Sequence, residues 1–364
     1  MKGLLTIRYL FFEMLPGFIL GMAVFVSIIL MFQVLRLTDF AISHGLELST
    51  VAEIIGYVCI SMLPALFPMS LLFSVLLTYG RLSNDSEIVA IKASGLSMST
   101  ILTPALILSF FVALISAQTS FYLAPWGNRK FEVLYSRAAS TKPAIAIKAG
   151  TFSEGFFDMV VYANEVDSEK GTLKKVFIYD PRESNSPLTI IAKSGKIVPD
   201  PENPGRNILL RLNDGDIHRK SETHTKIKFD SYDIKLIDPI KIEEREKSPQ
   251  SMTLSDLKKS LSQPQMNEED QRTLMTEWHK RWAIAFLCIV FGTVGVGLGT
   301  NTNRRNQKAG GMILCVILII VYWGTYVTFE GLSRSGQLPP LLAMWLPNLI
   351  FGTIGFETLR RNWN

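Results

Sequence analysis

Six long stretches without a charged residue constrain this chain more than any other feature of its sequence. The hydrocarbon core of a bilayer is about 30 Å thick and needs about 20 residues of α-helix to cross it. Each stretch is long enough, and no other uncharged run approaches this length. They are Met14–Leu35, Ile54–Gly80, Ala93–Asn128, Trp282–Asn303, Ala309–Phe329 and Ser335–Phe356. The pattern predicts six membrane helices, the first of them retained rather than cleaved as a signal peptide.

Most of the charge lies in one segment between the third and fourth stretches. The chain has 364 residues with 37 Lys and Arg and 32 Asp and Glu, and 50 of these 69 charges fall in residues 125–281. This segregation excludes a single soluble enzyme and indicates a membrane protein with a polar domain outside the bilayer. The segment itself holds 26 positive and 24 negative charges. That balance argues against nucleic acid as a partner, because nucleic acid requires a basic face.

Basic residues in the short flanks of the six stretches predict the orientation, because they accumulate on the cytoplasmic side. One side holds nine of them, namely Lys2, Arg8, Arg81, Lys92, Arg304, Arg305, Lys308, Arg360 and Arg361. The other side holds only Arg36 and Arg334. We therefore expect both termini in the cytoplasm and residues 125–281 on the opposite side.

Two of the apolar stretches contain residues that shape helices. Pro64 and Pro68 interrupt the second stretch and mark either a static kink or a functional hinge. Glycines recur through the fourth stretch, at Gly292, Gly295, Gly297 and Gly299. Small residues on successive turns predict close contact with neighbouring helices.

Residues 144–237 change to a period of two, which is typical of β-strands. Short β-rich runs lie at Ala144–Lys148, Met159–Val166, Lys174–Tyr179, Leu188–Ala192, Asn207–Leu212 and Thr225–Ile237. Turn residues separate them, including Asn213-Asp214-Gly215. In the last run the apolar positions change parity, which predicts a β-bulge near Ser231. The spacing favours an all-β sandwich or jellyroll.

Helix signals return after this segment. Thr253 with Asp256 resembles a capping box, and Asn267 with Asp270 repeats the pattern before a run into Trp282. We expect two amphipathic helices, separated at Gln263-Pro264, that lead back into the membrane.

The sequence offers no constellation for catalysis or cofactor binding. It has no phosphate-binding Walker loop, no G-x-S-x-G elbow and no H-E-x-x-H motif. Its histidines lack a third ligand nearby, and its cysteines lie far apart in apolar runs, so we expect neither a metal site nor a disulfide framework. The apolar stretches also lack the ionisable residues of an ion-driven carrier. Any transport would need energy from another subunit.

The loop Gly80–Ser99 between the second and third stretches is the most informative segment. Asn84 or Asp85 is expected to cap a short helix that has Asp85 and Glu87 in its first turn and Lys92 in its last, with Gly95 ending it. Its aliphatic residues Ile88, Val89 and Ile91 exceed what a solvated loop requires. We expect these aliphatics to be exposed, so that the helix either docks into a groove on a partner or lies on the lipid surface.

At this loop the chain resembles the permeases of lipopolysaccharide export, the LptF/LptG family. The resemblance covers essentially the whole chain and rests on short motifs in a fixed order. They are Leu63-Pro64 with Pro68, Gly80-Arg81-Leu82-Ser83, Asp85-Ser86-Glu87-Ile88, Ala93-Ser94-Gly95-Leu96-Ser97, Ala124-Pro125-Trp126, Glu277 to Arg281, Leu338-Pro339-Pro340 and Trp345-Leu346-Pro347-Asn348.

The resemblance implies a fold and a division into parts. The fold is an α-helical membrane protein with six transmembrane helices in a 3+3 arrangement and an inserted periplasmic all-β, jellyroll-like domain. Helices 1–3 would occupy residues 1–124, with a coupling helix at about 84–95. The β domain would follow at 125–250, the amphipathic connector at 251–281 and helices 4–6 at 282–364.

The resemblance also implies a function and partners. Members of the family are permease subunits of ABC transporters in the bacterial inner membrane, and they are not themselves enzymes. They extract lipopolysaccharide and pass it to a periplasmic β-jellyroll bridge. Two permeases pair around a cavity above a dimeric ATP-binding subunit. Further partners are a single-span jellyroll protein of the LptC type and a soluble bridge protein of the LptA type.

Site residues can be carried over by position. The family's coupling glutamate matches Glu87, and Asp85, Ile88 and Ile91 lie on the same helix. Arg36 and Arg334 hold the approximate positions of basic residues that bind lipid A phosphates. Some members have more basic residues after the first helix, whereas this chain has Asp39 and His44 there. The single basic residue favours the F type over the G type.

Two other functions fit the same sequence features. One is a permease for another lipid or for a lipoprotein. The other is a non-transporting membrane scaffold whose external domain binds a periplasmic partner. A soluble ATP-binding subunit that copurifies with the chain would separate transporter from scaffold, and mass spectrometry of the bound lipid would separate the two kinds of permease.

Overall fold

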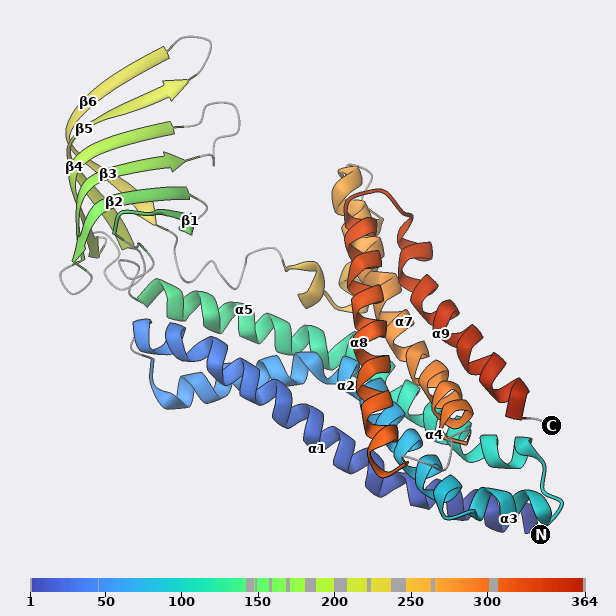
Figure 1. The fold of residues 1–364 in the computed structure, drawn as a ribbon. Helices are drawn as coiled ribbons and strands as arrows, with labels where there is room; N and C mark the ends of the chain where they lie inside the picture. The colour runs from blue at the N-terminus through green and yellow to red at the C-terminus, as the bar shows by residue number, and fades with distance from the viewer. Residues whose placement is uncertain are drawn as a thin grey trace. The chain divides into compact units, whose positions relative to one another are not determined.

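The six apolar stretches form helices in the computed structural model (Figure 1). The structure describes residues 2–44, 46–141, 147, 149–156, 159–167, 171–180, 188–199, 208–220, 224–236, 247–262, 266–300 and 307–362. Within these ranges, six helices are long and apolar enough to cross a membrane. They are α1 (Lys2–His44), α2 (Leu48–Asn84), α4 (Met98–Gln118) with its continuation, α7 (Glu268–Gly299), α8 (Gln307–Arg334) and α9 (Pro340–Asn362). The predicted six-helix arrangement is confirmed by length and composition.

The third span differs from its predicted limits. Ala93 ends a separate short helix, α3 (Glu87–Ala93), and the long helix begins only at Met98. From there α4 continues through a π-helical turn, η1 (Thr119–Leu123), into α5 (Ala124–Thr141). Gly95, with a φ of 85°, separates the two helices, as the sequence predicted.

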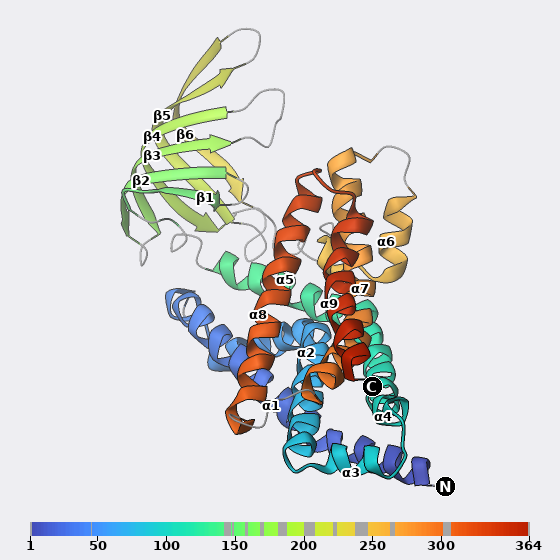
Figure 2. The same cartoon turned by 45° about the vertical axis from the view of Figure 1, so that its right-hand side comes forward.

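The chain divides into two compact units, each described by itself. The first, the helical unit, comprises residues 1–34, 55–130 and 247–364, and the second comprises 35–54 and 131–246. The helical unit also contains a 3₁₀ turn, η4 (Pro249–Ser251), and a short helix, α6 (Leu254–Leu261) (Figure 2). We call residues 247–262 the connector. This segment is shorter than the predicted connector of residues 251–281, because α7 begins at Glu268 and continues into the membrane span. The two predicted helices are present as α6 and α7, and the predicted break at Gln263-Pro264 lies outside the described residues.

Helix α7 is the centre of the helical unit and packs against α4, α8 and α9. Its glycines permit this packing. A Cβ added at Gly295 would lie 2.7 Å from a methyl group of Val75 on α2, and one at Gly297 would lie 2.2 Å from the hydroxyl of Thr358 on α9. The close helix contacts predicted from the glycine spacing are confirmed.

A buried polar bridge also links α7, α8 and α9. Tyr322 donates a hydrogen bond to Oδ1 of Asn348 at 2.9 Å, and Nδ2 of Asn348 donates to the carbonyl oxygen of Ala283 at 2.8 Å. All the polar atoms of the Asn348 side chain are thus used inside an otherwise apolar bundle.

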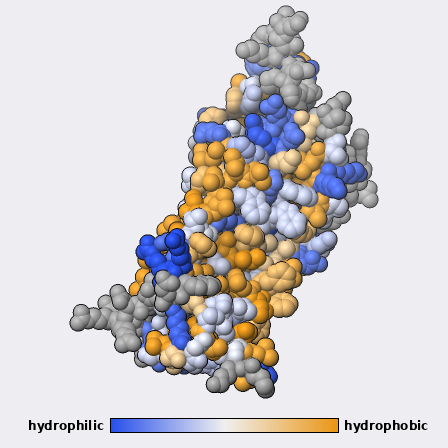
Figure 3. Space-filling view, turned by 90° about the vertical axis from the view of Figure 1, so that its right-hand side faces the viewer, coloured by the Kyte–Doolittle hydropathy of each residue, from blue (hydrophilic) through white to orange (hydrophobic). Residues whose placement is uncertain are grey.

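The outward surface of the helices is apolar. Figure 3 shows hydrophobic residues covering much of the middle of one face. Exposed apolar side chains of α8 include Ile313, Ile320 and Val327, each more than half exposed. So large an apolar surface suits lipid as the surrounding medium.

The second unit contains one antiparallel sheet in which each described strand pairs with its sequence neighbours. Its strands are β1 (Phe152–Phe156), β2 (Met159–Asp167), β3 (Thr172–Asp180), β4 (Leu188–Pro199), β5 (Ile208–Lys220) and β6 (His224–Leu236). The predicted runs from Met159 onward fall on β2 to β6. Strand β1 was not predicted, and the run Ala144–Lys148 lies largely outside the described residues. The inserted all-β domain is confirmed.

Two sequence predictions for this sheet are wrong. Asn213-Asp214-Gly215 is not a turn, because β5 continues through it and stays paired with β4 on one side and β6 on the other. No bulge interrupts β6 near Ser231, because the pairs Asn213↔Ser231 and Gly215↔Phe229 keep the same register with β5.

The parity change behind the bulge prediction is nevertheless real, and it affects several strands together. In β3 the buried residues change from an odd position, Leu173, to an even one, Val176. In β5 they change from an even position, Leu212, to an odd one, Ile217. Lys175 and Asp214, at corresponding positions, have φ values of 49° and 52°. A bulge adds a residue to one strand only. Here the alternation of buried and exposed side chains changes parity in neighbouring strands at the same register position. The strands therefore stay paired.

Candidate functional site

The short helix α3 lies between α2 and α4, where the sequence predicted a docking helix. Neither Asn84 nor Asp85 caps it. Instead α2 runs to Asn84, and the N-cap is Ser86, which has a φ of 60° and makes no side-chain capping bond. The predicted cap is therefore wrong, because the helix preceding α3 is longer than expected and takes up Asn84.

The aliphatic residues of α3 do not form a common exposed face. Ile88 is 4% exposed and belongs to the core formed with α1, α2, α4 and α7, and Ile91 packs partly against the same core. Val89 is 56% exposed. The expectation that Ile88 is an exposed aliphatic is wrong, since that side chain anchors α3 to its own protein.

The two acidic residues predicted for the first turn of this helix have different surroundings. Only Glu87 lies on α3, and the prediction for Asp85 is wrong, because Asp85 precedes the N-cap Ser86. Asp85 is exposed and Glu87 is half-buried. The hydroxyl of Tyr9 on α1 donates a hydrogen bond to Oε2 of Glu87 at 3.0 Å. Beside this bond runs an open groove of about 370 Å³ between α1 and α3, lined by Leu5, Thr6, Tyr9, Glu87, Ala90 and Ile91. The arrangement presents a carboxylate at the edge of a partly apolar groove.

The two candidate head-group arginines fall in different units. Arg36 is an exposed residue of α1 in the second unit. Arg334 ends α8 in the helical unit, and its Nη2 donates to Oε1 of Glu330 at 2.6 Å. The two residues lie four positions apart on α8, a spacing at which opposite charges on a helix pair.

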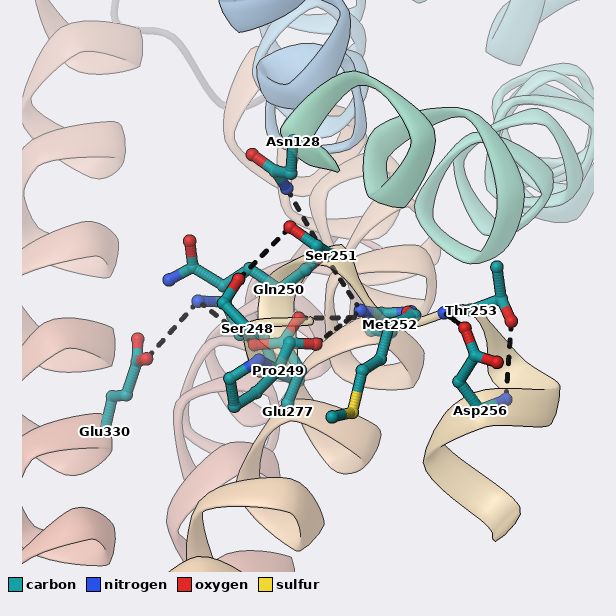
Figure 4. Close-up of polar contacts among 12 residues, drawn as sticks. Asn128, Ser248, Pro249, Gln250, Ser251, Met252, Thr253, Asp256, Glu277 and Glu330 are labelled. Carbon is teal, nitrogen blue, oxygen red and sulfur yellow. Dashed lines mark hydrogen bonds and ion pairs between the residues drawn. The ribbon is translucent and has the colours of Figure 1, made fainter. Parts of the chain in front are cut away.

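Arg281 on α7 holds the connector in place. Figure 4 shows its partners Pro249, Gln250, Met252 and Glu277. Its side chain is 3% exposed and pairs with Oε1 of Glu277 at 3.1 Å. Its guanidinium also donates to the carbonyl oxygens of Met252 at 2.8 Å, Pro249 at 3.1 Å and Gln250 at 3.3 Å. A planar guanidinium with five N–H donors suits such a set of acceptors.

Other contacts attach this centre to two further helices. Nδ2 of Asn128 on α5 donates to the carbonyl oxygen of Gln250 at 3.3 Å. Nζ of Lys280 lies 3.3 Å from Oε1 of Glu330 on α8 and 3.9 Å from Oε2 of Glu277. The end of α7 therefore joins α5, α8 and the connector through charged and polar groups.

Sequence reasoning did not assign a role to Arg281. The sequence feature that could have indicated its role is the two basic residues Lys280 and Arg281, which lie between Trp278 and Trp282 beside an apolar run. A charge so close to a membrane span is costly unless it is paired. Its partners, however, include three backbone carbonyls about 30 residues away in the chain, and no local pattern identifies those.

The described residues contain no group of three or more His, Cys, Asp or Glu that could hold a metal ion. Cys59, Cys288 and Cys315 are unbridged, and the latter two are buried. The features of this molecule are thus an apolar helical bundle, a short helix with a carboxylate at one end, a charged junction at the other and an inserted β domain.

Comparison with known proteins assigns these features to a family. The family model described as "Lipopolysaccharide export system permease LptF/LptG" matches residues 8–361. This chain belongs to the LptF/LptG family. It is 23% identical over 361 residues to the lipopolysaccharide export system permease protein LptF of Escherichia coli K12, covering 96% of this chain and 92% of that protein.

The LptF of Shigella flexneri gives the same identity and coverage. A Rickettsia prowazekii protein, the uncharacterized protein RP871, is 22% identical over 236 residues, or 64% of either chain. An LptF/LptG member is a permease for lipopolysaccharide export, a transport protein rather than a catalytic one. The family predicted from the sequence motifs is confirmed.

Proposed function

We propose that this chain is the permease subunit of an ABC transporter that extracts lipopolysaccharide from the bacterial inner membrane. It passes the lipid to a periplasmic β-jellyroll bridge, with ATP hydrolysed in a separate subunit. Both termini are cytoplasmic, and the β domain is periplasmic. The observation that carries this proposal, beyond family membership, is α3: a short helix with an accessible carboxylate, held between two membrane helices.

Helix α3 is the docking element for the dimeric ATP-binding subunit. Glu87 and Asp85 offer acidic contacts, and Val89 offers an exposed apolar one. Ile88 and Ile91 support the helix from the inside, because Ile88 is buried in the core that α3 shares with α1 and α4. A force on α3 therefore reaches the membrane helices through packed side chains.

The residues that contact the lipid must differ in character from the α3 residues that contact the ATP-binding subunit. Several acyl chains require an apolar cavity, and an anionic head group favours positive charge at the rim. Arg36 is the stronger candidate for the head group, because Glu330 already pairs with Arg334. Exposing acyl chains to water costs about 0.8 kcal/mol per CH₂ group, so the β domain must shield them.

The partners follow from this assignment. They are a sister permease, identical or of the second type, the ATP-binding dimer, a single-span jellyroll protein of the LptC type and a soluble bridge of the LptA type. The F type is preferred, because Arg36 is the single basic residue that follows the first apolar stretch.

The decisive experiment measures lipopolysaccharide released per ATP hydrolysed by the complete complex in proteoliposomes. Glu87→Ala should lower this ratio while the complex still assembles. Glu357→Ala is a matched control, since that exposed glutamate on α9 pairs only locally with Arg361. A wild-type ratio for Glu87→Ala would reject the coupling assignment. Outward movement of the lipid by the chain alone in nanodiscs would reject the transporter mechanism.

A further inference from the structure

Four side chains connect α1 to the region around α3. Tyr9 donates its hydroxyl proton to Oε2 of Glu87 at 3.0 Å, across 78 residues of sequence. One turn further along α1, Glu13 forms an ion pair with Arg81 near the end of α2. The charges of Glu13, Arg81 and Glu87 all act on the Tyr9 hydroxyl. We call Tyr9, Glu13, Arg81 and Glu87 the α1–α3 latch.

Helix α3 depends on contacts outside itself for its position. It has seven residues, too few for a stable isolated helix. Its N-cap Ser86 has a left-handed backbone and supplies no side-chain bond to the first turn. Ile88 fixes one face by burial, and the bond from Tyr9 fixes the direction of the Glu87 side chain at the start of the helix.

The part of α1 near the latch is fastened firmly to α2. The hydroxyl of Ser74 donates to the carbonyl oxygen of Met14 at 2.6 Å in the buried interior. A Cβ added at Gly21 would lie 3.2 Å from the carbonyl oxygen of Ser70, so the two backbones almost touch. This contact fixes the first half of α1 relative to α2 and α3.

The next part of α1, residues 22–36, contains no buried side chain in the structure as described. Its exposed side chains include Ile28, Met31 and Phe32, which are 42%, 55% and 61% exposed. Only 6% of the most apolar window of this helix is buried. A helix fixed along its first half and without buried side chains over residues 22–36 can transmit a displacement of that half as a rigid body.

We propose that Tyr9 is a positioning residue that orients the Glu87 carboxylate and passes movement of α3 to α1. The proposal rests on the proposed function, in which the ATP-binding subunit acts on α3. Tyr9 touches neither lipid nor nucleotide in this role. Without its hydroxyl, Glu87 loses a fixed direction and α1 loses its polar contact with α3, while the apolar packing of both helices remains.

Tyr9→Phe tests this role, because it removes only the hydroxyl. In the complete complex in proteoliposomes, lipopolysaccharide released per ATP should fall by about three- to tenfold, the range expected for loss of one hydrogen bond. Assembly yield and the Tm of the complex should stay at the wild-type level. Tyr122→Phe is the matched control, because this exposed tyrosine lies in η1, beyond the far end of α4. A merely structural role would lower yield and Tm and leave the ratio unchanged.

A double-mutant cycle separates this inference from the proposed function. Because Tyr9 acts through Glu87, Tyr9→Phe should cause no further loss in a Glu87→Ala background. Additive losses would overturn the inference, as would a wild-type ratio for Tyr9→Phe beside an impaired Glu87→Ala. A wild-type ratio for Glu87→Ala would instead reject the coupling role of α3 itself.

Discussion

The hydroxyl of Ser116 on α4 donates a buried hydrogen bond to the carbonyl oxygen of Pro64 on α2, at 3.2 Å. In a regular helix that carbonyl would accept from the backbone N–H of residue 68. Residue 68 is Pro68, which has no N–H. A side chain from the neighbouring helix thus supplies the missing donor, and α2 continues without a break through both prolines.

Ser116→Ala should therefore destabilise the helical unit by about 1–3 kcal/mol, the cost of a buried polar group left without a partner. Thermal unfolding in detergent measures this change. The informative comparison is Pro68→Ala, which restores an N–H for the Pro64 carbonyl. In that background Ser116→Ala should cost much less. Equal costs in both backgrounds would show that the bond between Ser116 and Pro64 does not serve this purpose.

Removal of Arg281 should be more damaging than removal of its whole ion pair. Arg281→Met removes the hydrogen-bonded partner of the buried Glu277 and leaves that carboxylate only Lys280, 3.9 Å away. Breaking a buried ion pair in this way costs about 3–5 kcal/mol. The double variant Glu277→Gln/Arg281→Met removes both charges and should recover part of that loss, although the connector carbonyls still lack donors. The measurements are the Tm in detergent and the rate of proteolytic cleavage within residues 247–262. A double variant less stable than Arg281→Met would contradict the pairing.

The sequence predicted those features of the fold that depend on local patterns. Six uncharged stretches became six long helices, and alternating residues became strands β2 to β6, because period and length are local properties. The capping box at Thr253 is also confirmed, since Asp256 and Thr253 each bind the other's backbone N–H. The second N-cap, Asn267, is placed correctly but makes no side-chain capping bond.

Features that depend on neighbouring elements could not be predicted from the sequence. The parity change in β6 was interpreted as a bulge, because one strand cannot reveal that its partner shifts at the same row. Ile88 looked like an exposed aliphatic because its burial depends on helices far away in sequence. The role of Arg281 depends on backbone carbonyls of the connector, and backbone groups carry no sequence signature.

The two candidate head-group arginines should respond differently to charge reversal. Arg334 is already paired with Glu330, so Arg334→Glu mainly breaks a local contact and creates a like-charge pair. Arg36→Glu should reduce the stimulation of ATPase activity by lipopolysaccharide more strongly, if the proposed head-group site is correct. The comparison is made in the complete complex, with Arg361→Glu on α9 as a control. Unchanged stimulation in Arg36→Glu would reject that site.

Stability of the connector should depend on pH through Asp256. Nζ of Lys247 donates to its carboxylate at 2.6 Å, and this bond, with that from the Thr253 N–H, holds the pKa of Asp256 below its usual value. A lowered pKa means that the ionised form stabilises the folded state above the ordinary pKa, and that this stability disappears as the pH falls through the lowered value.

Asp256→Asn retains an acceptor for Thr253 but has no charge. Its Tm should lie below that of the wild type at pH 7, and the gap should close in acid, below about pH 4. Lys247→Met should show the same closing gap, because it removes the other partner. A gap that stays constant from neutral pH into strong acid would show that Asp256 gains nothing from ionisation in the folded chain.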